Sequence, residues 1–502
     1  MSGDGFDVAV YGATAGGVCA AVAAARAGVR TLLVEPGRHV GGMVTGGLGR
    51  TDMDRQQHVI GGLAREFFMQ AGAAYGEPIA WRFEPSVAAA VFDRWLDEAR
   101  IEVLLEAGRG TVEKDGARIA RVDFAAGRRV AADVWIDASY EADVMAMAGV
   151  GFTRGRESRE LHGESLAGRQ EMLPNAHQFR RTVAASGPDG NLLPRVRPYA
   201  EVGPLGHGDE LLQSYCYRLC LTRDASGTRI EEPHAYERGR YELLARYVRA
   251  LGDDATIRDF AGIAELPNGK VDVNSGGPVS TNLLGASWDY PDADEDGRVA
   301  IAREHLHWAH GLLWFLATDP CVPAALRREV GRYRLPRDEF TATDGWPPQL
   351  YVREARRMLG EYVMAQHDLA PDAHKPDSIG MGGYNVDIRE VQWVAAPISR
   401  FPDVVEEVLV EGYLSVPVGP YEIPYRSLLP RAEECSNLLL TTCISASHVA
   451  FNSFRLEPQF MIGGHAAGVA AALAVRSGVG VHHVDVSRLQ AHLERQGQIL
   501  RL

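Results

Sequence analysis

The hydrophobic positions over residues 7–45 alternate between short apolar runs and one long alanine-rich stretch. Residues 8–11 (VAVY) form a run short enough for a buried parallel strand, and residues 31–34 (TLLV) form a second one. Between them, a glycine turn leads into the alanine-rich stretch, which stops before Gly28 as a helix with a C-terminal glycine does. The pattern predicts a strand–helix–strand unit of the kind found in doubly wound α/β sheets.

This unit carries most of a dinucleotide-binding fingerprint. Gly12 allows a tight turn after the first strand, so that backbone amides and the helix dipole can meet a pyrophosphate. Gly17 lets the helix lie close to the sheet, and Glu35 ends the second strand where an acid can accept hydrogen bonds from a ribose diol. Thr14 replaces the second glycine of G-x-G-x-x-G, so the context supports the prediction more than the motif does. A Rossmann-like unit without a dinucleotide is the alternative.

A second glycine cluster, GGMVTGG at residues 41–47, follows almost directly. FAD is held extended, so its pyrophosphate and its flavin need two close approaches of the backbone, which favours FAD over a nicotinamide. The residues expected to contact FAD here are Gly12, Ala13, Thr14, Ala15, Gly16, Gly17, Glu35, Pro36, Gly41, Gly42, Met43 and Thr45. His39 precedes the cluster, and covalent flavin attachment there is an alternative to noncovalent binding.

Residues 101–105, 119–124 and 131–136 are expected to form further strands. The last of these ends on the small residues Ala138 and Ser139, at a point where a doubly wound sheet admits ligand. Asp143 lies in the next predicted helix, where an acid suits either a ligand or the helix dipole.

The central section lacks a second G-x-G-x-x-G after a strand, so no built-in NAD(P)H domain is expected. It mixes predicted strands and charged helices, among them 237–251 and 299–316, with long loops. Residues 353–361 (REARRMLGE) are interpreted as a helix whose Arg353 could bind an anion, although a salt-bridged face is the alternative. We interpret the section as a substrate-binding insertion that could also join copies of the chain into a homo-oligomer.

The chain then returns to its first unit. Residues 437–442 (NLLLTT) predict a buried strand, and a long alanine-rich helix is expected to start at 462–468. Gly463 and Gly464 at that start could aim amides at the pyrimidine end of the flavin. The predicted organisation is an FAD-binding domain from residues 1–155 plus 430–502, interrupted by an insertion domain at 156–429.

Candidate catalytic residues cluster just before this helix. Oxidation of a C–H bond beside O–H or N–H needs a base, and a histidine suits that near neutral pH. His448 is the candidate base, Asn452 shares its surface on a helix, and Arg455 could bind an oxyanion or pair with Glu457. Two further candidates are Tyr425 on the substrate side and Ser445 on the cofactor side.

The chain resembles the FAD-dependent oxidoreductases of the glutathione-reductase-like flavoprotein superfamily, in a branch sometimes labelled xanthan lyase. The pieces that carry the resemblance are VYGATAGGVCAA, VGGMVTGGLGRTD, WIDASYEADVMAMAGV, REARRMLGEYV, DSIGMGGYNVDIRE, IPYRSLLP and CISASHVAFNSFRLEPQFMIGGHAAGVAAAL. It implies an α/β fold, with a Rossmann-like FAD-binding domain of the GR2 type and a large α+β insertion. It also implies that the backbone around Val112 lies against the adenine of FAD.

Composition and charge limit the classes of partner and the location that we expect for the protein. A formal net charge of -14 argues against nucleic acid and anionic membranes as partners. No signal peptide and no run of apolar residues long enough to span a membrane is visible, which makes a cytoplasmic location the expectation. The 6 cysteines include no C-x-x-C pair, which disfavours an iron–sulfur site and a redox-active disulfide.

The sequence thus predicts an FAD enzyme that oxidises a small polar molecule at a C–OH or C–N bond by hydride transfer to flavin N5. Oxygen or an external acceptor would reoxidise the flavin, because no internal NAD(P)H domain is expected. A flavin monooxygenase with external reductant is one alternative. A non-redox lyase or binding protein is another.

Overall fold

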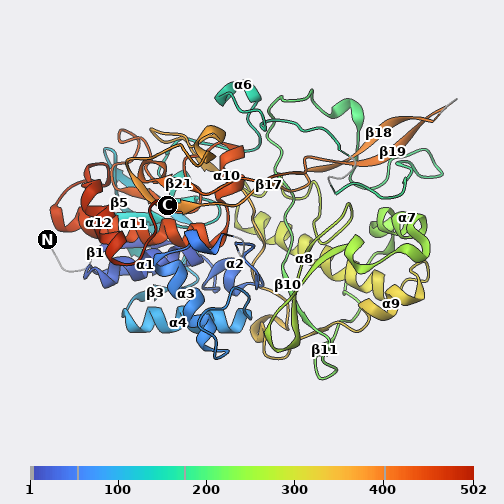
Figure 1. Cartoon of the computed structure of the whole chain (residues 1–502), viewed down its shortest axis with the longest axis horizontal. Coiled ribbons are helices and arrows are strands. Elements are labelled where there is room, and N and C mark those ends of the chain that lie inside the picture. The colour runs from blue at the N-terminus through green and yellow to red at the C-terminus, as the bar shows by residue number, and fades with distance from the viewer. Residues whose placement is uncertain (1–4, 54–55, 174–176, 401–402) are drawn as a thin grey trace.

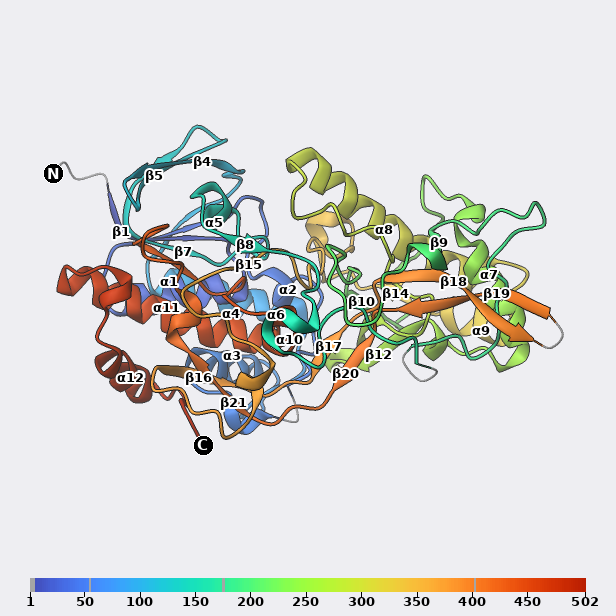
Figure 2. The same cartoon turned by 90° about the horizontal axis from the view of Figure 1, so that it is seen from above.

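The computed structural model describes residues 5–53, 56–173, 177–400 and 403–502. Two views of the ribbon show two halves along the long axis (Figures 1 and 2). One half contains the first elements of the chain together with the last, α10, α11 and α12. The other half contains the middle of the chain, with α7, α8 and α9.

The bounds of the elements show a strand-and-helix alternation at the start of the chain. The first part contains β1 (Phe6–Tyr11), α1 (Ala15–Arg26), β2 (Thr31–Val34), α2 (Gly42–Thr45), α3 (Gly62–Ala73), α4 (Pro85–Glu98), β3 (Glu102–Leu104), β4 (Gly110–Asp115), β5 (Arg118–Phe124), β6 (Arg129–Val130), β7 (Ala132–Asp137) and α5 (Asp143–Met147). The last part contains β22 (Leu438–Leu440), α10 (His448–Phe454), α11 (Glu457–Ser477) and α12 (Val486–Arg495). The predicted strand–helix–strand unit is confirmed as β1, α1 and β2.

The middle part is more irregular. Its elements are β8 (Phe152–Thr153), α6 (Arg159–His162), β9 (Val196–Pro198), β10 (Leu219–Thr222), β11 (Thr228–Arg229), α7 (Glu242–Leu251), β12 (Ala261–Glu265), β13 (Lys270–Ser275), α8 (Glu295–Thr318), α9 (Ala324–Val330), β14 (Arg334–Leu335), β15 (Arg357–Met358), β16 (Ser378–Gly382), β17 (Val386–Ile388), β18 (Gln392–Arg400), β19 (Asp403–Glu411), β20 (Leu414–Val416) and β21 (Tyr421–Pro424). The helices expected over 237–251 and 299–316 are present as α7 and α8.

A five-stranded sheet of order β22-β7-β1-β2-β3 forms the centre of the first half. Every pairing in it is parallel, with Tyr11 opposite both Val34 and Asp137. The strand order reverses between β1 and β7, because the chain goes outward to β2 and β3 and then returns to the other side of β1. Ligands of open α/β sheets bind at such a reversal, beyond the carboxyl ends of the strands.

The two faces of this sheet pack against different layers. Alternate strand residues point to opposite faces, so Val8 and Val10 join the core that contains α1 and α11. Ala9 and Tyr11 join a second core with β4, β5 and β6, in which Tyr11 stacks on Phe124 at 5.8 Å between ring centroids. Both faces of β1 are buried, which explains its continuous apolar run.

Helices α1 and α11 lie directly against each other through small residues. A Cβ on Gly464 would collide with the carbonyl oxygen of Gly16, and one on Gly468 would collide with that of Ala20. This contact corrects the sequence interpretation of the glycine pair. Helix α11 begins at Glu457, so Gly463 and Gly464 lie inside the helix, and Gly464 serves helix packing rather than an amide-lined helix start.

The second half is built around an antiparallel sheet of order β11-β14-β10-β13-β12. The hairpin of β18 and β19 projects beyond it, with β9 pairing along one edge (Figure 2). Segments of the predicted insertion also return to the first half: β16 pairs with β21, and Ser378 in β16 donates a hydrogen bond to the carbonyl of Leu500.

The expected helix over residues 353–361 is wrong. Only the short strand β15 forms there, and it pairs with β8. The three arginines are buried and bind different parts of the chain: Arg353 donates to the carbonyl of Ser214, Arg356 to that of Glu141, and Arg357 to that of Gly155. These divergent partners replace the single face that a helix would have given the arginines.

In the described part of the chain, one helix, α11, is long and apolar enough to cross a membrane. Of its most apolar window, 94% is buried inside the fold. Helix α11 is therefore a core element of this structure.

Candidate functional site

A cavity of about 310 Å³ lies beyond the carboxyl ends of β1 and β7, where the strand order reverses. We call it the cradle cavity. Its lining residues are Gly12, Thr14, Glu35, Pro36, Gly37, Arg109, Ser139, Tyr140, Glu141, Asp143, Tyr290, Glu295, Arg298, Val299, Pro348 and Gln349. It therefore combines predicted cofactor contacts from the first unit with side chains of α8 and its preceding loop.

The turn after β1 depends on the absence of a side chain at Gly12. Its φ is 91°, and a Cβ there would lie 2.6 Å from the backbone nitrogen of Ser139. The turn ends at Thr14, which caps α1: its hydroxyl accepts from the Gly17 amide at 3.1 Å and donates to the Ala138 carbonyl at 2.8 Å. Thr14 thus links the helix start to the end of β7, which explains the departure from the glycine fingerprint.

Glu35 is held against the same turn. One carboxylate oxygen accepts from the Ala13 amide and the other from the Gly37 amide, each at 2.8 Å. Burial raises the pKa of Glu35 to about 7. The carboxyl group is therefore held in place in the lining of the cradle cavity.

Asp143 anchors a group of arginines on the opposite wall. It accepts from Arg298 at 2.7 and 2.9 Å and from Arg356 at 3.1 Å, and Arg109 lies 3.7 Å away. Burial alone would raise the pKa of Asp143, but Arg298 and the other arginines lower it below its usual value. Arg109 and Arg298 also line the cavity, so they offer cationic groups to an anionic ligand.

The second glycine cluster packs against the turn after β1 and against Tyr140. The Gly41 amide donates to the Ala13 carbonyl at 2.6 Å, and a Cβ on Gly42 would collide with the Tyr140 hydroxyl. That hydroxyl accepts from the Met43 amide at 2.9 Å. His39 and Thr45 instead line a separate open cavity beside α4, so His39 does not line the cradle cavity.

Tyr140 and Glu457 form a wall between the cradle cavity and a second one. The Tyr140 hydroxyl donates to Glu457 at 2.6 Å; Tyr140 lines the cradle cavity and Glu457 lines the other. The second carboxyl oxygen of Glu457 is buried without a hydrogen-bond partner among the described residues. Burial raises the pKa of Glu457 to about 8. The start of α11 thus places a carboxyl group that titrates near neutral pH between two cavities.

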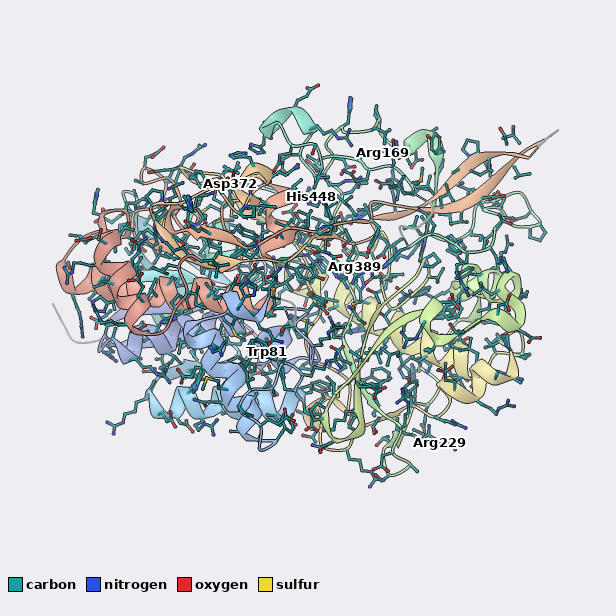
Figure 3. The ribbon with its side chains drawn as sticks, viewed as in Figure 1. Trp81, Arg169, Arg229, Asp372, Arg389 and His448 are labelled. Atoms are coloured by element: carbon teal, nitrogen blue, oxygen red, sulfur yellow. The ribbon has the colours of Figure 1, made fainter. Side chains whose placement is uncertain are left out.

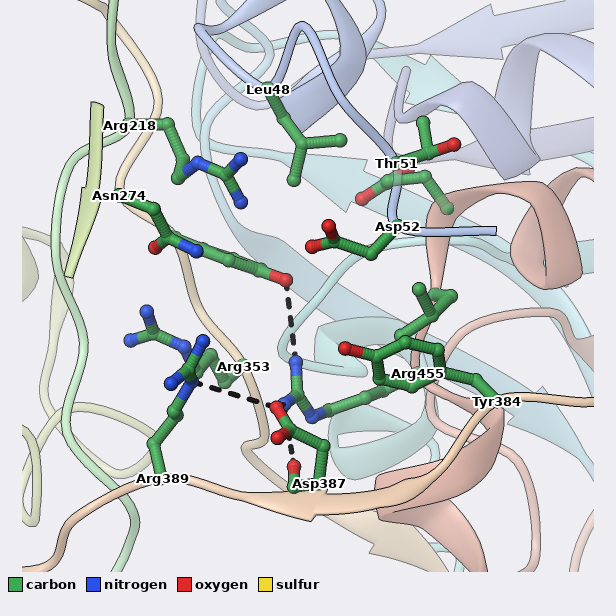
Figure 4. A pocket seen from close by; sticks show the side chains of 13 residues that line it. Leu48, Thr51, Asp52, Arg218, Asn274, Arg353, Tyr384, Asp387, Arg389 and Arg455 are labelled. Carbon is green, nitrogen blue, oxygen red and sulfur yellow. Dashed lines mark hydrogen bonds and ion pairs between the residues drawn. The ribbon is translucent and has the colours of Figure 1, made fainter. Parts of the chain in front are cut away.

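The second cavity, which we call the arginine cavity, is narrow and mostly polar (Figure 4). Its lining residues are Leu48, Thr51, Asp52, Arg218, Asn274, Tyr351, Arg353, Tyr384, Asp387, Arg389, Arg455, Leu456 and Glu457. They come from the second glycine region, the insertion and the return segment. Neither half of the molecule forms this cavity alone.

Arg455 enters the arginine cavity from the end of α10. Its guanidinium donates to Asp387 at 2.9 Å and to the Tyr351 hydroxyl at 3.3 Å (Figure 4). It also donates to the Asn452 side chain at 3.0 Å. The sequence alternative, a pair with Glu457, is wrong, because Asp387 is its carboxylate partner.

His448 is not among the residues that line the arginine cavity, and it lies near the middle of the molecule (Figure 3). It starts α10, which Ser447 caps by accepting from the Ala450 amide at 3.1 Å. Its Nδ1 lies 2.8 Å from Glu354, and its Nε2 is buried without a partner among the described residues. Asn452 donates to Glu354 at 3.1 Å, so a chain of contacts joins His448 to Arg455.

Burial alone would raise the pKa of Glu354, but His448 and Arg357 outweigh it and hold the pKa at about 2. Glu354 therefore stays ionised beneath the cavity. The group that sequence reasoning chose as base thus belongs to a buried charged network.

Several predicted residues do not line the part of the molecule that the sequence suggested for them. Tyr425 donates to the Val481 carbonyl at 2.9 Å, and the Ser445 hydroxyl accepts from the Gly360 amide at 3.0 Å. Val112 pairs with Val122 inside its small sheet, and Arg109, not Val112, lines the cradle cavity. Arg353 lines the arginine cavity instead of the cofactor side.

Much of the arginine cavity is lined by residues that the sequence did not single out. Asp52, Arg218, Asn274 and Arg389 stand in unrelated segments, and no spacing rule joins them. A signal existed for Asp52, the last residue of the VGGMVTGGLGRTD piece of the family resemblance, and for Asp387 and Arg389, which lie in the DSIGMGGYNVDIRE piece. For Arg218 and Asn274, only the folded chain shows the grouping.

The cradle cavity fits a dinucleotide. Gly12 leaves space that a side chain would fill, Glu35 is placed for a ribose, and Arg109 and Arg298 supply cations. A family model described as "FAD dependent oxidoreductase" matches residues 7–493. The comparison with curated proteins gives no match.

Solved structures give partial matches. OxyS anhydrotetracycline hydroxylase from Streptomyces rimosus is 17% identical, with a TM-score of 0.23 over 37% of this chain and 43% of that one. L-amino acid deaminase from Proteus vulgaris is 14% identical, with a TM-score of 0.24 over 32% and 63%. Glycerol-3-phosphate dehydrogenase from Bacillus halodurans, complexed with FAD, is 11% identical, with a TM-score of 0.22 over 29% and 37%. The chain covers less than two thirds of each, and these likenesses carry no conclusion about activity.

Proposed function

The chain belongs to the FAD-dependent oxidoreductase family, and we propose that it oxidises a small polar substrate at a C–OH or C–N bond. FAD is its cofactor. When bound, it would supply the acceptor for the hydride, and oxygen or an external acceptor would take up the electrons. The substrate loses that hydride from carbon and a proton from oxygen or nitrogen. The protein must therefore hold the substrate and accept one proton.

The observation that carries the proposal is the wall shared by the two cavities. Tyr140 faces the cradle cavity and binds Glu457, which faces the arginine cavity. Hydride transfer needs direct contact between flavin and substrate, so the flavin end of a cofactor held in the cradle cavity would have to reach the Glu457 side of this wall. The polar lining of the arginine cavity suits a small polar molecule.

The residues proposed to hold FAD surround the turn after β1. Gly12 provides the close approach, Glu35 would bind the ribose, and Arg109 would face the pyrophosphate or the adenosine. The α1 helix start adds its dipole beside them.

Glu457 is better placed than His448 to accept the proton. It lines the arginine cavity, it has an unpartnered carboxyl oxygen, and its pKa near 8 suits proton transfer at neutral pH. His448 lies behind the cavity on Glu354. We assign His448 a positioning role, in which Glu354 and Asn452 hold Arg455 toward the substrate.

The experiment that tests this function is anaerobic mixing of the purified holoenzyme with panels of small alcohols, hydroxy acids and amines. The proposal expects one class to bleach the flavin absorbance without added reductant, and air to restore it. Product formation that requires NAD(P)H and oxygen would instead indicate a monooxygenase. Product formation while the flavin stays oxidised would indicate lyase chemistry.

A further inference from the structure

We infer that the substrate carries a carboxylate, and that Arg353 and Arg389 bind it in the arginine cavity. This inference rests on the proposed function and deepens it, because it names the substrate class as small hydroxy- or amino-carboxylates. Both side chains line the cavity, on the same side of it (Figure 4).

Arg353 is a buried cation without a carboxylate partner among the described residues. It is 2% exposed, and it donates to the Ser214 carbonyl at 2.5 Å and toward the Cys216 sulfur at 3.1 Å. Its Nε has no hydrogen-bond partner in the part of the chain that the structure describes. Burial lowers the pKa of Arg353 below its usual value. A buried, unpaired cation is costly, and an anionic ligand would remove that cost.

Arg389 is only loosely paired. Within the described chain, its guanidinium has a single carboxylate contact, from Nε to Asp387 at 3.5 Å, and Asp387 is already bound by Arg455 at 2.9 Å. The terminal nitrogens of Arg389 thus remain available on the cavity side. A guanidinium with two free parallel donors matches the geometry of a carboxylate.

The other arginines of the cavity are paired. Arg218 forms a two-bond pair with Asp272, and Arg455 has Asp387. Burial raises the pKa of Asp52 while nearby guanidinium groups, among them Arg218 and Arg389, lower it, so Asp52 counts as a further carboxylate of the cavity. The high pKa of Glu457 leaves its carboxyl largely protonated at pH 7. The lining residues and Asp272 thus set four arginines against three aspartates, and the one positive charge left over favours a ligand with one negative charge. The cavity has only about 10 Å³ of free space, about enough for one water, so the ligand must be small and must displace lining side chains when it binds.

The test measures binding rather than turnover. Lactate and lactamide, alanine and alaninamide, and inorganic phosphate are titrated into the oxidised holoenzyme under anaerobic conditions, and dissociation constants are taken from the change in flavin absorbance. The acids of a pair are expected to bind at least about tenfold more tightly than the amides, because charge-assisted pairs are lost in the amides. Equal affinities, or phosphate binding more tightly than any acid, would overturn the inference.

Variants locate the site. Arg389→Gln and Arg353→Gln should each weaken acid binding about tenfold or more and leave amide binding unchanged. Arg229→Gln, in the exposed strand β11 at the edge of the molecule, removes the same charge as a control and should change neither (Figure 3). If Arg353→Gln no longer holds flavin, the result for Arg389→Gln decides the test. Its fold should be less disturbed, because Asp387 remains paired with Arg455 in that variant. Unchanged acid binding in Arg389→Gln would refute the assignment.

The two proposals fail differently. If amides or neutral alcohols bleach the flavin as well as acids do, the carboxylate inference falls and the oxidase or dehydrogenase function stands. If acids bind tightly through Arg389 but no compound bleaches the flavin, the carboxylate site stands and the proposed oxidation falls.

Discussion

The cradle cavity and the arginine cavity differ in the groups that form them. The cradle cavity is built from a turn, a helix start and strand ends, and Gly12 and Thr14 act through backbone geometry. The arginine cavity is built from long charged side chains, such as Arg218 and Arg389, that arrive from separate segments. Backbone geometry suits a cofactor shared by a whole family, whereas side chains adjust specificity for one substrate. We therefore expect changes in the first cavity to act on FAD binding, and changes in the second on the substrate.

The largest effect is expected at the wall between the cavities. Glu457→Gln should slow anaerobic flavin reduction by roughly 10²–10⁴-fold, the usual contribution of a general base. In the unaltered enzyme, the reduction rate should rise with pH through about 8, because only the ionised carboxylate accepts a proton. Stopped-flow absorbance measures both. If the reduction rate of Glu457→Gln still rises with pH near 8, another group is the base.

The same carboxyl also makes stability depend on pH. Its folded pKa of about 8 lies above the ordinary value of 4.5, so the folded state binds the proton more tightly. The resulting stabilisation, at most roughly 5 kcal/mol, is complete below about pH 4.5 and is lost as pH rises through 8. Thermal unfolding from pH 6 to 9 should therefore show a decline that Glu457→Gln flattens. An equal decline in both proteins would contradict the raised pKa.

The next largest effect is expected in the cradle cavity, on the binding of FAD and not of the substrate. Gly12→Ala places a Cβ 2.6 Å from Ser139 in a backbone with positive φ, at a cost of about 1–3 kcal/mol. FAD affinity should fall about tenfold to a hundredfold, measured by titration of the apoprotein. Gly127→Ala is the matched control, because Gly127 also has positive φ but its Cβ would meet nothing within 4 Å. Comparable loss of FAD in both variants would refute a specific role for Gly12.

A smaller effect is expected behind the arginine cavity. His448→Gln disturbs the contacts with Glu354 and Asn452 that orient Arg455, so KM for the substrate should rise by up to about tenfold. The pH step near 8 should remain, since the proposed base is elsewhere. A loss of that step would return the role of base to His448, as the sequence suggested.

The smallest effect is expected at the helix cap. Thr14→Ala removes the hydroxyl that accepts from Gly17 and donates to Ala138, and should reduce the free energy of unfolding by about 1 kcal/mol. Denaturant unfolding measures this change. Arginine-cavity ligands should bind as before, and weaker binding of them would show that the two cavities are coupled.

Local pattern was a good guide where one stretch of chain makes one structure. β1, α1 and β2 were predicted with nearly their observed bounds, because apolar runs, a glycine turn and a helix cap stand in one continuous segment. The role of Thr14 was not predictable, since its second partner, Ala138, lies far along the chain.

The errors came where tertiary contacts overrode local pattern. Residues 353–361 have helical spacing, yet their buried arginines satisfy carbonyls from separate segments. The start of α11 was placed too late, because Gly463 and Gly464 were interpreted as a helix end and instead contribute to helix packing. The arginine cavity shows the limit most clearly, as Asp52 and Arg218 meet only after the whole chain has folded.

The close contact of α1 with α11 has a consequence for how the protein is made. During synthesis, α1 and the Gly12 turn leave the ribosome long before α11, so the nascent chain exposes an alanine-rich surface without its partner. Neither β22 nor Glu457 is available to complete the sheet and the wall until the chain has been synthesised past residue 457. Cofactor loading is then a late event of biogenesis, and a stalled chain would depend on chaperones to cover its apolar surface.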